Sequence, residues 1–279
     1  MIFVDNIGAY VERYRTFDEP VPYKDIFVYP VKVRDYYRFT SSLDVLTIEK
    51  NKIPDVKIIQ MSYLLFLLQI IIEDVKFKDK FINILDLCFR PKKSSEYYNE
   101  KFTVGELLYG QIGEDELYFI NGYDVNFVKR GNNVTLVING CVITAIEFNE
   151  LIDIIQFQNI PDYDNEKMSD DFKALMEEYY KLRNKNIKPP TLEEQLIAIM
   201  GQNGMSKKEL LDETIYTIKG MLDSIMGKVD YEVQHLYRSH AMTDKKLPDI
   251  EHWVIKSKKD KYADLFTNLD KYKQQFEAN

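Results

Sequence analysis

The stretch that decides the fold class is ELYFINGYDVNFVKRGNNVTLVINGCVI, residues 116–143. Its four short apolar runs are rich in β-branched and aromatic residues, which favour strands. Turn residues separate the runs, among them Asn121-Gly122 and Asn139-Gly140. Asn-Gly between apolar runs is the strongest local hairpin signal, because both residues of a type I′ turn need positive φ. We therefore predict a small antiparallel β meander of three or four strands at about 116–143.

Helical patterns flank this stretch on both sides. Before it, a short strand at 26–33 leads into a helical region that ends near residue 90, and Asp55 is a suitable N-cap for an apolar helix over 56–75. After it, Thr144 and Glu147 have capping-box spacing, and helices are predicted within 145–182. The predicted fold class is α+β, mainly α-helical, with residues 1–188 forming a mixed N-terminal region.

Residues 189–279 are predicted to form a C-terminal helical module that follows a polar, proline-ended linker. Two more capping boxes, Thr191 with Glu194 and Ser206 with Glu209, mark helix starts. A long helix is predicted from about Thr214 to Tyr237. Its apolar positions keep helical spacing and comprise Ile218, Leu222, Ile225, Val229, Val233 and Leu236.

The last segment has the a/d spacing of a helix that packs along another helix. Its apolar residues step by 3, 4, 3 and 4 along the chain, at Tyr262, Leu265, Leu269, Tyr272 and Phe276. Two interpretations stay open: the segment folds back on its own domain, or it binds a partner. The candidate partner-binding residues of the whole module are Leu222, Ile225, Val229, Trp253, Leu265, Leu269, Tyr272 and Phe276.

Composition excludes several classes of protein. The net charge of −8 argues against broad nucleic-acid binding, which needs a positive surface.

Cys88 and Cys141 lie in apolar runs, which predicts buried free thiols, with a disulfide as the minor alternative. The N-terminus lacks the pattern of a secretory signal. The most apolar run, 58–72, is shorter than the roughly 20 residues that cross a bilayer, so we expect a core helix and no membrane contact.

The sequence contains no recognisable catalytic, cofactor-binding or metal-binding motif. His235 and His240 are five residues apart, whereas helical zinc pairs are four apart. The acidic run 162–166 lacks the later glycine and acidic residue of a calcium loop. We predict no catalytic residues, no cofactors and no metal. An enzyme that uses scattered acidic residues stays open as an alternative.

One family resemblance is present. The residues that carry it are Gly204-Met205-Ser206, Leu210-Leu211, the helix 215–226, Pro248 and His252-Trp253. This arrangement resembles the C-terminal part of tail assembly chaperones and related tail proteins of long-tailed bacteriophages. The segments 29–37 and 61–64 also resemble tail-module proteins of phages and prophages of Gram-positive hosts.

The resemblance implies a non-enzymatic protein that acts through protein–protein contacts. Its partners would be the tape-measure protein or other tail proteins, such as tail tube or baseplate subunits. Its location would be the host cytoplasm or the virion. A structural virion subunit of the baseplate or tail is the first alternative to an assembly chaperone.

Overall fold

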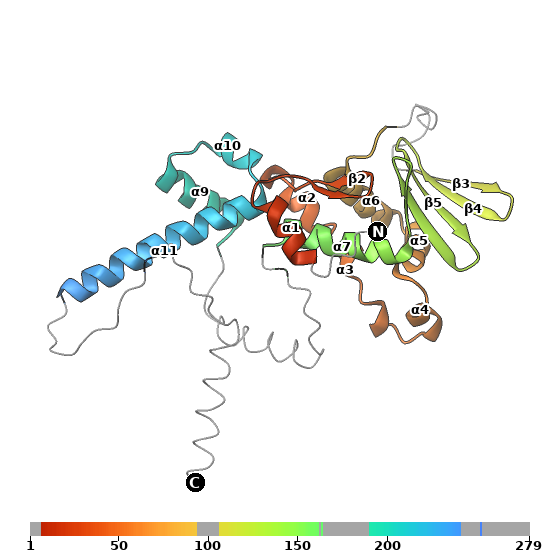
Figure 1. Ribbon diagram of the computed structural model, residues 1–279, viewed down its shortest axis with the longest axis horizontal. Coiled ribbons are helices and arrows are strands. Elements are labelled where there is room, and N and C mark those ends of the chain that lie inside the picture. The colour runs from red at the N-terminus through yellow and green to blue at the C-terminus, as the bar shows by residue number, and fades with distance from the viewer. Residues whose placement is uncertain (1–6, 94–105, 162, 164–189, 241–251, 253–279) are drawn as a thin grey trace, which may run out of the picture. The chain divides into compact units, whose positions relative to one another are not determined.

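The computed structural model describes residues 7–93, 106–161, 163, 190–240 and 252 (Figure 1). The chain divides into two compact units, Met1–Lys219 and Gly220–Asn279. The fold is α+β, as the sequence predicts. The predicted boundary between residues 188 and 189 adjoins residues outside the described ranges, so it stays a prediction.

The main sheet of the first unit is antiparallel, and its strands follow one another in chain order. They are β3 (Leu107–Ile112), β4 (Asp115–Ile120), β5 (Val125–Arg130), β6 (Asn133–Ile138) and β7 (Cys141–Ile143). The turn between β6 and β7 has positive φ at both Asn139 (52°) and Gly140 (80°), which is the geometry that Asn-Gly predicts.

The predicted extent of the meander was wrong, because the sheet has five strands and starts at residue 107. The missed strand, β3, contains Gly110, and a glycine inside a strand weakens the local signal. In the folded chain the Phe119 ring of β4 covers this glycine. Its Cε2 lies 3.3 Å from where a Cβ on Gly110 would stand. Packing against β4 therefore stabilises β3, although the sequence of β3 alone favours a strand only weakly.

A second, two-stranded sheet pairs β1 (Val21–Tyr23) with β2 (Ile26–Val28). The strand predicted over 26–33 is shorter in the structure, since β2 ends two residues before Pro30. Proline has no amide hydrogen to donate to a sheet, which explains why the pairing stops there.

The helix predicted over 56–75 is interrupted. Asp55 caps α4 (Val56–Gln60) as predicted, but the chain becomes extended at Met61 and Ser62. The Ser62 hydroxyl accepts a hydrogen bond from Leu65 N–H at 3.2 Å and starts α5 (Tyr63–Glu73). Serine side chains compete for backbone amides in this way, so they favour caps over helix interiors.

Short helical elements complete this part of the chain. They are α1 (Ile7–Arg15), η1 (Val33–Asp35), α2 (Tyr36–Thr40), α3 (Asp44–Thr47), η2 (Lys50–Lys52), α6 (Val75–Ile84) and the π-helical turn η3 (Leu85–Phe89). Cys88 and Cys141 are buried free thiols, as predicted, and burial raises the pKa of Cys88.

Helix α7 (Ala145–Asn159) begins with the predicted Thr144–Glu147 capping box. Helices α5 and α7 pack against the sheet at β6 (Figure 1). The sheet face that joins the core carries Phe127 and Leu136, both fully buried. The helix predicted to start at Ser169 lies outside the described residues.

The remaining helices are α9 (Leu192–Asn203), α10 (Lys207–Asp212) and α11 (Ile215–His240). Both predicted capping boxes are present, and Gly204 ends α9 with φ of 71°. Just after α10, the Glu213 carbonyl accepts a 2.9 Å hydrogen bond from Val33 N–H, and Arg34 pairs with Asp212. None of the helices in the described ranges has the length and apolarity that crossing a bilayer needs.

The capping box of α9 predicts a pH-dependent helix start. Hydrogen bonds from the Thr191 backbone and hydroxyl lower the pKa of Glu194. A carboxyl with a lowered folded pKa adds stability above its unfolded pKa of about 4.3, and this stability is lost as pH falls through the folded value. Glutamine keeps the capping hydrogen bond without titrating. We expect α9 amides to lose exchange protection on acidification in the parent and less so in Glu194→Gln.

Hydrogen exchange corrected for intrinsic rates measures this effect between about pH 5 and pH 3, the range around the ordinary glutamate pKa. Protection that falls in parallel in both proteins would contradict the prediction.

Candidate functional site

Helix α11 carries a row of exposed apolar side chains, which we call the α11 stripe. It consists of Leu222, Met226, Val229, Val233 and Leu236. The steps of 4, 3, 4 and 3 keep these residues on one face of the helix. Leu222 is half-buried, and the other four are 45–64% exposed. The stripe spans fifteen residues, and its ends lie about 21 Å apart along the helix axis.

Single exposed apolar residues are ordinary, whereas a continuous row marks an interaction surface. In the described part of the chain, α11 carries more large exposed apolar side chains than any other element, since Tyr237 is exposed beside the stripe. The stripe is therefore the strongest candidate for a functional surface.

The first turn of α11 belongs to the first unit and is anchored there by hydrogen bonds. The Thr214 hydroxyl accepts from Thr217 N–H at 3.2 Å, so Thr214 is the N-cap. Both threonine hydroxyls donate to the Asp18 carboxylate, at 2.5 Å from Thr214 and 2.9 Å from Thr217. A negative charge at a helix N-terminus is favourable, because the amides there point outward unpaired.

Arg15 adds a second anchor. Its guanidinium lies 4.2 Å from the centre of the Tyr216 ring, and its Nη1 donates to the Phe157 carbonyl at 2.7 Å. The Tyr216 hydroxyl in turn donates to Glu12 at 3.1 Å. Arg15 and Glu12 of α1 thus both hold Tyr216, and the end of α7 in turn holds Arg15. Sequence reasoning missed these anchors, because nothing near Arg15 or Asp18 points to a partner some two hundred residues later.

The predicted partner-binding residues divide into two groups. Ile225 is half-buried beside the stripe, and Leu222 and Val229 belong to it. Met226 completes the stripe but was not among the predicted residues. The other predicted residues lie outside the described ranges, and they are Trp253, Leu265, Leu269, Tyr272 and Phe276.

His235 and His252 both lie near one aromatic ring, that of Tyr231. The Tyr231 ring centre is 4.3 Å from that of His235 and 5.2 Å from that of His252. The described residues contain no group of three or more His, Cys, Asp or Glu side chains placed to hold a metal ion.

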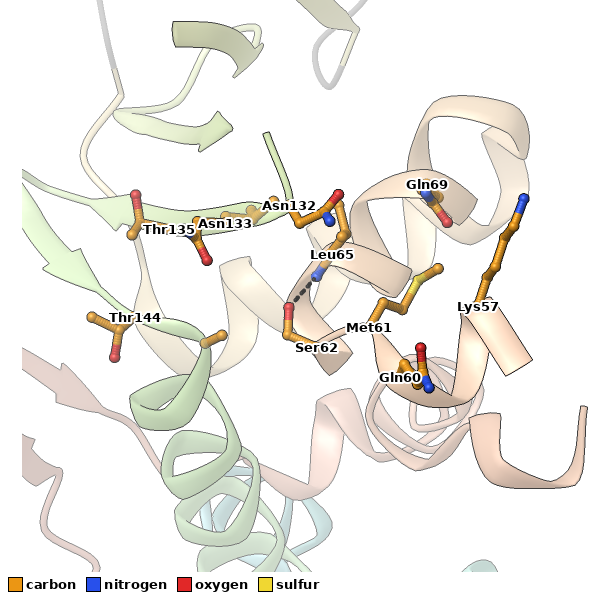
Figure 2. A pocket seen from close by; sticks show the side chains of 12 residues that line it. Lys57, Gln60, Met61, Ser62, Leu65, Gln69, Asn132, Asn133, Thr135 and Thr144 are labelled. Carbon is orange, nitrogen blue, oxygen red and sulfur yellow. Dashed lines mark hydrogen bonds between the residues drawn. The ribbon is translucent and has the colours of Figure 1, made fainter. Parts of the chain in front are cut away.

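A pocket of about 830 Å³ opens between the helices and one end of β6 (Figure 2). Its lining comes from three separate segments, Lys57 to Gln69, Asn132 to Thr135, and Thr144 with Ala145. Seven of the twelve lining residues carry amide or hydroxyl groups, and Lys57 is its one titratable side chain. The hydroxyls of Ser62 and Thr144 already accept from the amides of the helices that they cap. The lining supplies no acid–base pair and no nucleophilic thiol.

Two tyrosines with raised pKa values connect separate elements of the first unit through their hydroxyl groups. Burial and the 2.6 Å hydrogen bond to Glu150 raise the pKa of Tyr23, which joins β1 to α7. Burial raises the pKa of Tyr63 to about 12, and its hydroxyl donates to the Val45 carbonyl at 2.8 Å. Both hydroxyls stay protonated near neutral pH and act as hydrogen-bond donors.

No protein-family model matches the chain, and neither does any curated protein or solved structure. The function must therefore be inferred from the residues and contacts themselves. They define an α+β protein with an apolar stripe along its longest described helix.

The Asp18 anchor predicts a measurable loss of stability. Thr214→Ala removes the N-cap hydroxyl of α11 and should cost about 1–2 kcal/mol. Thr16→Ala is the matched control, because its hydroxyl makes one exposed hydrogen bond to the Glu12 carbonyl. The control should cost about 0.5 kcal/mol or less. Urea unfolding of both variants measures the difference.

A double-mutant cycle then tests whether Asp18 is the hydrogen-bond partner of Thr214. Asparagine tolerates the positive φ of 54° at residue 18, so Asp18→Asn removes the charge without straining the backbone. The effects of Asp18→Asn and Thr214→Ala should not be additive, since the two residues share a hydrogen bond. Additive effects would contradict the anchor.

Proposed function

We propose that this protein is a non-enzymatic tail assembly chaperone of a phage or prophage. It binds an amphipathic helix of the tape-measure protein through the α11 stripe. The observation that carries the proposal is the stripe itself, a row of five apolar side chains of which four are largely exposed. The resemblance of 204–226, Pro248 and His252-Trp253 to tail assembly chaperones supplies the class of partner.

The chemistry of the stripe suits a partner helix. Side chains spaced by 4 and 3 residues form knobs that fit between the side chains of a second helix with the same spacing. Charged residues flank the stripe, and Lys228 pairs with Glu232 at 3.9 Å on the same helix. A contact of about 21 Å buries less surface than a stable complex does. Such a contact suits a chaperone, which must release its partner when the tail tube forms.

Co-expression with the candidate tape-measure protein tests the proposal. For this test the candidate is the product of whichever neighbouring open reading frame encodes a very long helical protein. The two proteins should co-purify, and Val229→Asp should weaken the complex at least about tenfold, because it places a charge in the apolar contact. Ser224→Asp is the matched control: it adds the same charge to an exposed position of α11 away from the stripe and should leave affinity unchanged.

Equal affinities of the two variants would contradict the role of the stripe, and the failure of any tail protein to bind would contradict the function. Mass spectrometry of purified particles separates the chaperone from a structural subunit. A chaperone should be absent from the particles, whereas a subunit should occur in fixed stoichiometry.

A further inference from the structure

Strand β3 forms one edge of the five-stranded sheet (Figure 1). Among the described residues, β4 is the only strand that pairs with it. An edge strand carries backbone N–H and C=O groups on its outer side, and these groups can pair with a strand of another molecule. The outer side of β3 is therefore a candidate surface for an extended strand.

One hydrogen bond shows which residues of β3 point outward. The Asn121 N–H donates to the Glu106 carbonyl at 2.7 Å, and these two residues continue the register of the β3–β4 pair. In an antiparallel pair, residues that exchange hydrogen bonds alternate with residues that do not. The even-numbered residues of β3 therefore bond to β4. The N–H and C=O groups of Leu107, Tyr109 and Gln111 point away from it.

The sequence of β3 lacks the features that usually protect an edge. Native proteins block edge strands with lysine or other charged residues, with proline, with a bulge or by keeping the strand very short. Strand β3 has six residues, none of them charged and none a proline, and each pairs with a residue of β4. The opposite edge strand, β7, has three residues, and Lys24 Nζ donates to its Val142 carbonyl at 3.0 Å. The two edges of the sheet thus differ, and β3 is the one suited to pairing.

The outward groups of β3 match those of a second copy of the chain. When two β3 strands run antiparallel with Tyr109 opposite Tyr109, Leu107 of each copy lies opposite Gln111 of the other. Every outward residue of both strands then belongs to a hydrogen-bonded pair. A shift by two residues in either direction leaves one outward residue of each strand beyond the end of the other. The register centred on Tyr109 is therefore the fullest.

Charges beside the strand agree with this register. Glu106 of each copy lies opposite Ile112 of the other, so no two carboxylates face each other. The register centred on Gly110 instead sets Glu106 opposite Glu114, and the two-fold symmetry repeats this like-charge contact. Like charges directly opposite each other are destabilising, which again favours the register centred on Tyr109.

The face of the sheet that forms the core is uncovered at β3. Tyr109, Tyr118 and Phe127 lie opposite one another on successive strands, so they share this face. Phe127 is fully buried, whereas Tyr109 is 62% exposed. The Tyr109 ring packs edge-on against Tyr118, with 5.4 Å between ring centres. In the proposed register the two Tyr109 side chains are cross-strand neighbours, so they extend this aromatic pair across the two-fold axis.

We propose that two copies of this protein pair along β3 and join their sheets into one continuous antiparallel sheet, with five strands from each copy. The two-fold axis passes between the two Tyr109 residues. Each copy contributes a single strand, so the contact is narrow and the dimer dissociates on dilution. This pairing does not rest on the proposed function, because it uses neither the α11 stripe nor a tail protein.

Sedimentation velocity of the full chain tests the pairing. The mass should rise from 33.0 kDa toward twice that value as the protein is concentrated from about 1 µM to about 100 µM. Gln111→Pro should weaken the dimer at least tenfold, because proline removes an outward N–H and is tolerated on an edge. Gln111→Ala is the matched control. It loses the same side-chain hydrogen bond to the Gly113 carbonyl but keeps the N–H, so it should dimerise like the parent.

Each outcome of the sedimentation experiment bears on the pairing. A monomer at every concentration would overturn it, and so would equal dimerisation of the proline and alanine variants when circular dichroism shows both to be folded. Val229→Asp separates the β3 edge from the α11 stripe. The dimer should persist in this variant, and its loss would assign the dimer to the stripe instead.

A single introduced cysteine tests the register without proline. Cys88 and Cys141 are buried, so a new surface thiol reacts selectively. Opposite residues of a hydrogen-bonded pair have Cα atoms about 5.5 Å apart, which a disulfide can bridge. Tyr109→Cys should therefore give a cross-linked dimer under mild oxidation.

The matched control for the cross-link is Gln111→Cys. In the proposed register its two thiols are four residues apart along the strands, roughly 14 Å, so it should cross-link at least tenfold more slowly than Tyr109→Cys. Mass spectrometry of the oxidised chains measures both rates. Equal rates, or faster closure of Gln111→Cys, would overturn the pairing.

Discussion

The long helix α11 depends on one carboxylate. Asp18 accepts hydrogen bonds from Thr214 and Thr217 at the start of the helix, where unpaired amides favour negative charge. Most helices in proteins are stabilised by burying an apolar face, yet the α11 stripe is largely exposed. The contacts of the first turn therefore matter more here than in an ordinary helix. Arg15 reinforces them by stacking on Tyr216.

The α11 stripe is an exposed apolar row on the longest helix of the described chain. An uncovered apolar row invites association, so the stripe suits contact with another apolar surface. The pocket near Ser62 offers neither an apolar row nor reactive groups, so it does not suit a partner helix.

Structural features that depend on neighbouring residues were predicted well, whereas features that depend on packing between distant segments were not. Asn139-Gly140 forms its turn, and the boxes at Thr144 and Thr191 cap their helices, because each of these bonds closes within four residues. The sequence indicated one helix across Ser62, where the hydroxyl in fact starts a new one. It missed β3, since Gly110 is acceptable in a strand only once Phe119 covers it.

The sequence by itself determined the α+β class, the sheet turns, the helix caps and the spacing of the apolar rows. Turns and caps are short-range hydrogen bonds, and spacing follows directly from helix geometry. Only the tertiary structure decided the five-strand extent of the sheet, the anchoring of α11 by Asp18 and Arg15, and which apolar residues of α11 stay exposed. Ile218 is buried while Val229 is exposed, although both share the helical spacing. That difference depends on what packs against each residue, and such contacts join segments far apart in the chain.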